Sequence, residues 1–207
     1  MTTPMMALPL RVPAPRPFLR AALALCACVA FFSLGAAGAV TAGFVAASDP
    51  RFRYEGRLDF TDPAAPVVIW QASRIAIDFE GDALALRLTD VKDQCFFNAV
   101  IDGRSSVVGL RSGKPPVGAA FHGLGAGRHT LRLFKRSEAA SGTVRFRGIE
   151  LAPGSRAWAP APPGYRLAME FIGDSITAGA CDEDGAVDQW EDRSTHDNAV
   201  SYGALAS

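Results

Sequence analysis

Short runs in which apolar residues occupy every second position dominate the middle of the chain. The runs 74–79 and 83–88 both alternate in this way, and a Glu-Gly-Asp turn separates them. Alternation with period two is typical of a half-buried β-strand, and a glycine-containing turn between two such runs is typical of a hairpin. The face that carries Ile75, Ile77 and Phe79 is therefore the one we expect to be buried.

The same period continues to about residue 152. Further strands are predicted at 95–101, 129–135 and 143–151, with a β-bulge at Gly148. We see no helical period between these runs. Many short strands separated by Gly and Pro are typical of a β-sandwich or jelly roll, which is the fold that we predict for residues 51–152.

The composition changes after this domain. Residues 153–165 carry four prolines, and proline fixes φ and removes a backbone donor. We therefore predict a semi-rigid linker, or a strap that lies over a surface.

Residues 166–207 are predicted to begin a second domain. The apolar run 166–172 is interpreted as a short buried strand that leads into a sharp turn at Gly-Asp-Ser, and a loop follows over 180–196. A helix is predicted from Asn198 to Ala206, with Asp197 or Asn198 as its N-cap. A strand, a turn, a loop and a helix in this order are typical of the start of an α/β domain.

The first 47 residues are predicted to lie outside both domains. Three arginines give a basic start, and residues 21–47 then run for 27 residues without a charge. This length is enough to cross a bilayer, which takes about 20 residues, and small residues near Ala39 and Ala42 suit signal peptidase. We interpret residues 1–47 as a secretory signal, which implies a secreted protein. The alternative is an uncleaved membrane anchor through residues 21–47.

Charge and cysteine usage exclude several classes of function. Without the first 47 residues, 18 basic residues remain against 21 acidic residues, so no basic patch predicts nucleic-acid binding. Only Cys95 and Cys181 remain, and they lie in different predicted domains, so they do not indicate a disulfide framework. The chain has no CxxC or HExxH pattern, and we predict no metal ion and no cofactor.

The candidate chemistry lies at the predicted turn. Ser175 would stand at the end of a strand with its hydroxyl exposed, as nucleophiles do in hydrolase elbows. Gly173 permits close approach, Asp174 would support the turn through hydrogen bonds, and the Ser175 backbone N–H would stabilise an oxyanion. Gly, Asp and Ser also favour ordinary turns, so a turn without catalytic function is the alternative.

The sequence around the turn resembles known families. The stretch 171–179, Phe-Ile-Gly-Asp-Ser-Ile-Thr-Ala-Gly, is similar to the first sequence block of the SGNH (GDSL-type) hydrolases. The preceding region resembles the N-terminal jelly roll of carbohydrate esterase family 2, as does a segment after the turn. The segments that carry this resemblance are 56–57, 79–81, 100–103, 127–130, 135–138 and 198–203.

The resemblance implies an exported esterase that removes acetyl groups from plant polysaccharides such as xylan. It implies a jelly roll followed by a flavodoxin-like SGNH domain, with Ser175 as nucleophile and its backbone N–H as one oxyanion donor. The later family blocks, which supply further oxyanion donors and an Asp-x-x-His base, have no counterpart among the 32 residues after Ser175. We therefore expect an incomplete chain in which residues 51–152 fold alone and 166–207 are poorly ordered.

Three histidines are candidates to replace the missing base. His129 lies in an alternating run and His122 beside a Gly-rich turn, so both are interpreted as structural or surface residues. His196 lies in the acidic loop, and the spacing from Asp192 differs from Asp-x-x-His. It would be the first candidate for a base within these residues.

Other residues of the same region allow weaker hypotheses. The acidic group formed by Asp182, Glu183, Asp184 and Asp188 suggests oxygen ligands for a cation, but a solvated loop is the favoured interpretation because the EF-hand spacing is absent.

Tryptophan rings can stack on sugar rings, and the chain contains three of them. Trp70 is predicted to lie in the core, whereas Trp158 and Trp190 are candidates for stacking on sugar rings. The alternative function is therefore a carbohydrate-binding or packing β-sandwich without catalysis.

Overall fold

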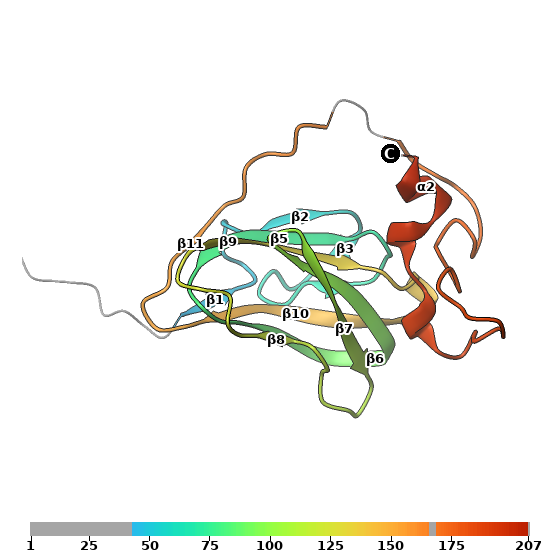
Figure 1. Ribbon diagram of the computed structural model, residues 1–207, viewed down its shortest axis with the longest axis horizontal. Helices are drawn as coiled ribbons and strands as arrows, with labels where there is room; N and C mark the ends of the chain where they lie inside the picture. The colour runs from blue at the N-terminus through green and yellow to red at the C-terminus, as the bar shows by residue number, and fades with distance from the viewer. Residues whose placement is uncertain (1–42, 166–168, 207) are drawn as a thin grey trace, which may run out of the picture. The chain divides into compact units, whose positions relative to one another are not determined.

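The computed structural model describes residues 43–165 and 169–206, which belong to one compact unit, Val40–Ser207 (Figure 1). Most of the predicted export segment lies outside the described residues. Phe44–Ala46, however, forms strand β1 and pairs with β10, so the β domain begins before the predicted Arg51. Within the described ranges, no helix has the length and apolar character that a membrane span needs.

The strands form two antiparallel layers that share one long strand. The first layer has the order β11-β5-β9-β6-β7, with β2 also paired to β5. Its strands are β11 (Ala157–Trp158), β5 (Arg74–Glu80), β9 (Arg128–Lys135), β6 (Leu84–Ile101), β7 (Arg104–Arg111) and β2 (Arg53–Glu55).

The second layer has the order β3-β4-β10-β6, with β1 paired to β10 and β8 to β6. Its further strands are β3 (Leu58–Asp59), β4 (Val67–Val68), β10 (Gly142–Leu151) and β8 (Ala120–Phe121). The two layers make a nearly closed, barrel-like β-sandwich, which agrees with the predicted fold of the first domain.

Strand β6 closes the sandwich because it belongs to both layers. Its 18 residues, Leu84–Ile101, join the two runs that the sequence predicts as separate strands, 83–88 and 95–101. The first half pairs with β10 and the second half with β7 and β9. The change of layer falls where Asp90 and Asp93 adopt positive φ angles of 52° and 55°, since a strand that turns a corner between sheets needs a local bend.

The core follows the predicted alternation. Ile77, Phe79, Leu131 and Leu133 are each 0% exposed, and they face the interior between the layers. The largest apolar side chains that are fully buried are Phe79, Phe97, Phe146, Ile75, Ile77, Leu84, Leu110, Leu131, Leu133 and Ile149.

The predicted bulge at Gly148 is present. The register of β10 against β6 shifts between Phe146 and Gly148, where φ is 132°. A Cβ at this position would lie 2.1 Å from Val45 O of β1, so the close approach of β1 requires glycine.

The proline-rich segment is part of the sandwich as well as a connection. Its residues Ala157 and Trp158 form β11, which extends the sheet beside β5. Tyr165 Oη also donates a hydrogen bond to Glu55 Oε2 at 3.1 Å. The segment therefore lies along one edge of the first layer.

The helices of the described residues 169–206 are all short. They are the 3-10 turns η2 (Arg193–Thr195) and η3 (Asn198–Val200) and the helix α2 (Tyr202–Leu205). Asp197 caps η3 through Ala199 N–H, and Ser201 caps α2 through Ala204 N–H. The single helix predicted over 198–206 is thus two short elements with separate caps.

Candidate functional site

The turn at residues 173–179 places Ser175 at the surface. Asp174 Oδ1 accepts a hydrogen bond from Ile176 N–H at 3.1 Å, and Asp174 O accepts one from Ala178 N–H at 3.1 Å. Ser175 O accepts a third from Ala180 N–H at 2.9 Å. Ser175 is exposed, and within the described part of the chain its hydroxyl forms no hydrogen bond. The nucleophile candidate is therefore accessible, and Asp174 braces the main chain around it.

Two glycines set the conformation of this turn. A Cβ at Gly173 would lie 2.0 Å from Thr177 Oγ1, because the Thr177 side chain folds back over the glycine and bonds Tyr202 Oη at 2.8 Å. Gly179 has φ 77°, and a Cβ there would lie 2.6 Å from Asp197 O. A side chain at Gly173 would displace Thr177 within the turn, whereas one at Gly179 would push the turn away from Asp197 and Asn198.

The segment before the turn does not form the predicted strand. Residues 169–173 lie outside any strand, and Ile172 is 90% exposed. Phe171 packs edge-on against Tyr202, with ring centroids 5.9 Å apart, and no described strand pairs with this segment. A buried strand of a parallel sheet needs cover on both faces. The prediction of a strand leading into an elbow is therefore wrong for the described residues, which show an irregular exposed segment before the turn.

A buried arginine joins the C-terminal segment to the β-sandwich. Arg136 directly follows β9 and is 3% exposed. Its Nε donates to His196 O at 3.1 Å and its Nη1 to Asn98 Oδ1 at 3.3 Å. Its Nη2 pairs with the Glu183 carboxylate and lies 3.5 Å from Asp197 Oδ2. One side chain thus contacts both the sandwich and three residues of the segment.

Asp197 is the second residue that joins the C-terminal segment to the β-sandwich. Its two carboxylate oxygens accept from Asn98 Nδ2 at 3.1 and 3.0 Å, and Oδ1 also accepts from Ala199 N–H at 2.9 Å. The Asp197 N–H donates to Gly179 O at 2.9 Å. A continuous path of bonds therefore runs from the sandwich through Asp197 to the turn that carries Ser175.

The expectation that residues 166–207 are poorly ordered stays a prediction, although several described side chains of this segment are buried. Ala178, His196 and Ser201 are 7%, 0% and 3% exposed. Sequence reasoning missed Arg136 as a docking residue because its partners lie 38 to 61 positions away. The available signal was the polar run Lys-Arg-Ser-Glu at 135–138, which is part of the family resemblance. The neighbouring sequence does not show that this run is buried.

The three histidines lie in different environments. His129 Nδ1 is 2.6 Å from Asp102 Oδ2, and this hydrogen bond raises the pKa of His129. His122 is exposed in a loop, whereas His196 is 0% exposed and burial lowers its pKa. Within the described ranges, none of the three hydrogen-bonds Ser175. The structure therefore brings no described histidine into position as its base.

One of the three tryptophans differs from its predicted place. Trp70 is 43% exposed, so the prediction that it lies in the core is wrong. The Arg128 guanidinium lies 4.7 Å from the centroid of the Trp158 ring, and that of Arg193 lies 4.4 Å from the Trp190 ring. Arginines therefore cover one face of each ring that was a candidate for sugar stacking.

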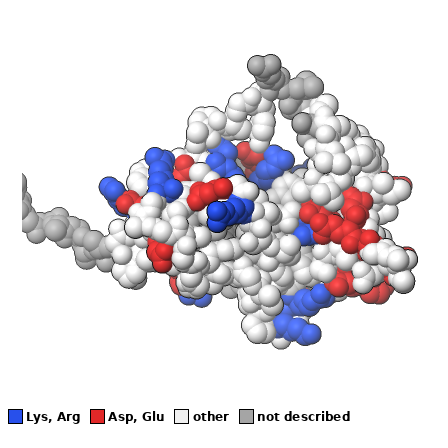
Figure 2. Space-filling view, viewed as in Figure 1, with Lys and Arg blue, Asp and Glu red and all other residues white. Residues whose placement is uncertain are grey.

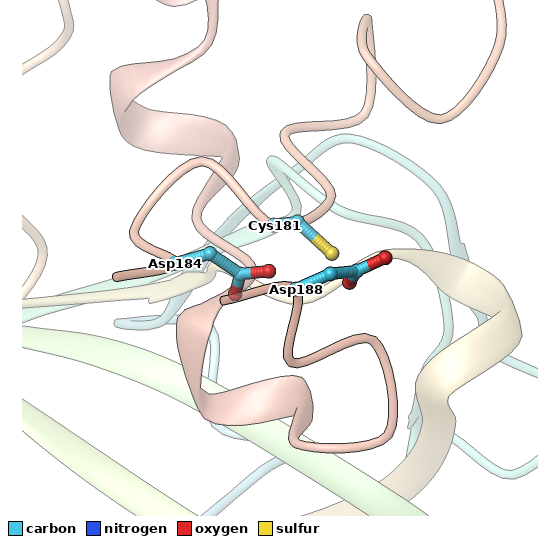
Figure 3. A group of neighbouring side chains, drawn as sticks. All are labelled: Cys181, Asp184 and Asp188. Atoms are coloured by element: carbon cyan, nitrogen blue, oxygen red, sulfur yellow. The ribbon is translucent and has the colours of Figure 1, made fainter. Parts of the chain in front are cut away.

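The acidic loop brings together a set of side chains that includes a cysteine. Cys181 Sγ and carboxylate oxygens of Asp184 and Asp188 lie within 4.8 Å of one another (Figure 3). Partial burial raises the pKa of the Cys181 thiol to about 11, and the hydrogen bond with Asp184 acts in the same direction. Glu183, which the sequence grouped with these carboxylates, pairs with Arg136 instead.

Acidic side chains gather on the side of the molecule where Figure 1 draws the C-terminal segment, as Figure 2 shows. Residues 182–192 of this segment include six acidic residues. This part of the surface is suited to cations and unsuited to phosphate groups.

The fold and the turn together define a class of chain in which a jelly-roll-like β-sandwich leads into a surface Gly-Asp-Ser turn. Comparison with known families makes the assignment specific. The family model described as "Carbohydrate esterase 2 N-terminal" matches residues 54–163, and the chain belongs to this family.

Curated relatives agree with this assignment. The chain is 30% identical over 159 residues to "Cellulase/esterase CelE" of Acetivibrio thermocellus, a match that covers 77% of this chain and 19% of that protein. It is 33% identical over 117 residues to an "Acetylxylan esterase / glucomannan deacetylase" of Cellvibrio japonicus, which covers 56% of this chain and 31% of that protein.

A solved structure shows the same fold. A family two carbohydrate esterase from Clostridium thermocellum, in complex with cellohexaose, matches with a TM-score of 0.66 and 30% identity. The match covers 74% of this chain and 46% of that one. The chain therefore spans less than half the length of each of these relatives.

Proposed function

We propose that this chain supplies the nucleophile and the accessory β-sandwich of a serine esterase that removes acetyl groups from plant polysaccharide. The observation that carries the proposal is the exposed Ser175 on a close-packed turn, held by buried bonds to a sandwich of the carbohydrate esterase 2 N-terminal family. Gly173 and Asp174 support the turn around it.

In this reaction Ser175 Oγ attacks the acetyl carbonyl carbon, and a base takes the hydroxyl proton. The Ser175 backbone N–H, at the start of the turn, donates to the oxyanion that forms. The sugar hydroxyl leaves with a proton, and water then hydrolyses the acetyl-enzyme to acetate. We assign the base and the further oxyanion donors to the part of the homologous esterases that this chain does not span.

The names of two relatives support a substrate class. Two curated relatives are named as acetylxylan esterase and glucomannan deacetylase, and we propose acetylated xylan or glucomannan for this protein. The exposed serine on a surface turn suits a polymer that lies along the surface better than a small molecule that needs an enclosed pocket.

Acetate release tests this proposal. We would measure release from acetylated xylan and from an aryl acetate, with the 207-residue chain and with a fusion of this chain to the remaining half of the matching family two esterase. Each would be compared with Ser175→Ala and with Ser112→Ala, a matched change at an exposed serine in another turn. Release that Ser175→Ala abolishes and Ser112→Ala leaves intact supports the proposal. Equal acetate release by the unchanged fusion and by the fusions that carry Ser175→Ala or Ser112→Ala contradicts it.

A non-catalytic role in carbohydrate binding is the second candidate, and the cellohexaose complex of the matching esterase favours it. Calorimetric titration of the chain with cellohexaose would measure this function. Binding that Ser175→Ala leaves unchanged, together with an inactive fusion, would favour the binding role over the esterase.

We also propose that the protein is exported, on the basis of the charge-free run before the sandwich. Cleavage after Ala42 would leave β1 intact, whereas removal of all 47 residues would delete it. N-terminal sequencing of the secreted protein tests this. A membrane-bound protein that keeps residues 21–42 would contradict cleavage and support an anchor.

A further inference from the structure

Both ring nitrogens of one buried histidine face hydrogen-bond acceptors. His129 of β9 is 7% exposed, and its ring packs against Phe79 of β5 with centroids 5.3 Å apart. Nδ1 lies 2.6 Å from Asp102 Oδ2, and Nε2 lies 3.1 Å from Gly125 O. A neutral imidazole has one N–H donor and one acceptor, whereas the charged ring has two donors. The charged ring is therefore the form that satisfies both contacts.

The two acceptors belong to different segments of the chain. Asp102 lies in the turn between β6 and β7, where its Oδ1 accepts a hydrogen bond from Thr130 N–H at 2.8 Å. Gly125 lies in the loop 122–127, which connects β8 to β9. The charged ring thus joins this loop to the turn after β6.

The loop 122–127 is attached to the sandwich at few points. Asp82 O accepts from Leu124 N–H at 3.0 Å, and Asp82 Oδ1 accepts from Gly125 N–H at 2.8 Å. A Cβ at Gly123 or Gly125 would meet open space, whereas the partly buried Leu124 packs against the core. Segments with few packed contacts open at a low cost in free energy. The bond from His129 to Gly125 O is therefore a substantial part of what keeps this loop closed.

We propose that protonated His129 latches the loop 122–127 to the turn after β6, and that loss of the proton releases the loop. The proton leaves from Nε2 to solvent, because Nδ1–H donates to a carboxylate and a charge-assisted bond is the stronger of the two. The lone pair of Nε2 then faces the oxygen of Gly125, so this bond is lost and Leu124 is freed to leave the core. The latch is separate from Ser175 and does not depend on the proposed esterase function.

The charged groups that act on His129 favour its protonated form. The hydrogen bond with Asp102 is the largest influence that raises the pKa of His129, Asp82 acts in the same direction, and burial opposes them. Because the folded-state pKa is raised, the latch is closed below the raised value and is lost as pH rises through it. Among the described residues, the other titratable side chains of the adjoining segments form no hydrogen bond or ion pair with His129; they are Asp78, Glu80, Arg104, His122, Arg128 and Arg132.

Nuclear magnetic resonance of the full chain, labelled with nitrogen-15 in its histidines, reads the ring protons directly. The signals of His129 are recognised by the contact of its ring with Phe79. At about pH 6.5, where an ordinary histidine is half protonated, we expect both ring nitrogens of His129 to carry a proton. A ring with a single proton at this pH overturns the proposal.

Hydrogen exchange of the Leu124 and Gly125 amides measures the release of the loop. The rates would be measured from about pH 6 to about pH 9, each divided by the rate of an unstructured peptide at the same pH. We expect protection to fall about tenfold as His129 titrates, which is the effect of losing one charge-assisted bond. His122→Gln, a change at an exposed residue of the same loop, should behave like wild type.

His129→Gln should give low protection of the loop without this dependence on pH. An equal fall in protection in His129→Gln overturns the proposal, as does constant protection in wild type while the ring titrates. If His129→Gln fails to fold, the wild-type chain decides alone. The midpoint of the ring titration and the midpoint of the fall in protection must then agree, and a difference between them overturns the latch.

Discussion

Replacement of Arg136 by alanine tests whether the β-sandwich holds the segment that carries Ser175. The change removes a guanidinium that is 3% exposed and that contacts Asn98, His196, Glu183 and Asp197. Because these partners lie on both sides of the contact, we expect the segment 178–201 to detach while the sandwich remains folded.

The magnitude follows from the burial of the partners. The Asp197 side chain is 5% exposed, and the loss of one partner from a buried ion pair costs about 3–5 kcal/mol. Asn98 still donates to Asp197 through Nδ2, which favours the lower end. The Glu183 side chain is 44% exposed, so its pair adds about 0–1 kcal/mol. We expect docking to weaken by about 3 kcal/mol, which corresponds to about 100-fold faster exchange of the amides that docking protects.

Hydrogen exchange with mass spectrometry on the full chain measures this effect. The Asn198 N–H, which donates to Arg136 O at 2.9 Å, should lose protection, and the amides of β5 and β9 should keep theirs. Arg87→Ala is the matched control, because the Arg87 and Glu150 side chains of that ion pair are 53% and 43% exposed. Equal exchange over 178–201 in both variants would refute the reasoning, as would equal acceleration throughout the sandwich.

Three further predictions follow from the fold. Gly179→Ala should also release the segment, since its Cβ would lie 2.6 Å from a backbone oxygen, whereas Gly185→Ala meets open space and should exchange like wild type. Phe146→Ala, at a fully buried position, should lower the free energy of unfolding by about 3–5 kcal/mol in urea titrations, and a loss below 1 kcal/mol would contradict the core assignment. Asp102 raises the pKa of His129 above 6.5, so this stabilisation is fully present below pH 6.5 and is lost as pH rises through the raised value. The Tm difference between wild type and Asp102→Asn should therefore shrink with rising pH, and a difference that grows would contradict the pairing.

The alternation of apolar and polar residues explains which features of the fold the sequence could predict. The alternation in 74–79 and 129–135 placed Ile77, Leu131 and Leu133 in the core, because a strand with one dry face must bury every second residue. The bulge at Gly148 followed from the same kind of local signal.

The continuity of β6 could not be read in this way. Its bend between layers occurs at Asp90 and Asp93, where positive φ angles interrupt the alternation. The sequence therefore shows two strands where the structure has one. Which sheet a strand enters depends on partners that lie far away in the chain, and local patterning carries no information on them.

The failed prediction at 169–172 has a related cause. An apolar run before Gly-Asp-Ser was interpreted as a strand, but a strand is stable only with neighbours to pair with. In the described chain the run has none, and Phe171 instead packs on Tyr202 of α2. The apolar residues alone thus predicted that this segment packs against another part of the protein, but they did not identify that part.

The run at 135–138 joins these observations. Lys135 Nζ donates to Ile69 O at 2.7 Å and Glu138 O at 3.0 Å, and Ser137 Oγ accepts from Phe96 N–H at 3.2 Å, so these two residues serve the sandwich. Arg136 and Glu138 face the C-terminal segment.

Four consecutive polar side chains would be costly to bury without partners. Each of the four has a partner in the sandwich or in the C-terminal segment. The sandwich is therefore built to receive the segment that carries Ser175. Truncation of the chain within 153–165 would remove His196, Glu183 and Asp197, and the buried Arg136 guanidinium would keep Asn98 as its partner from this contact.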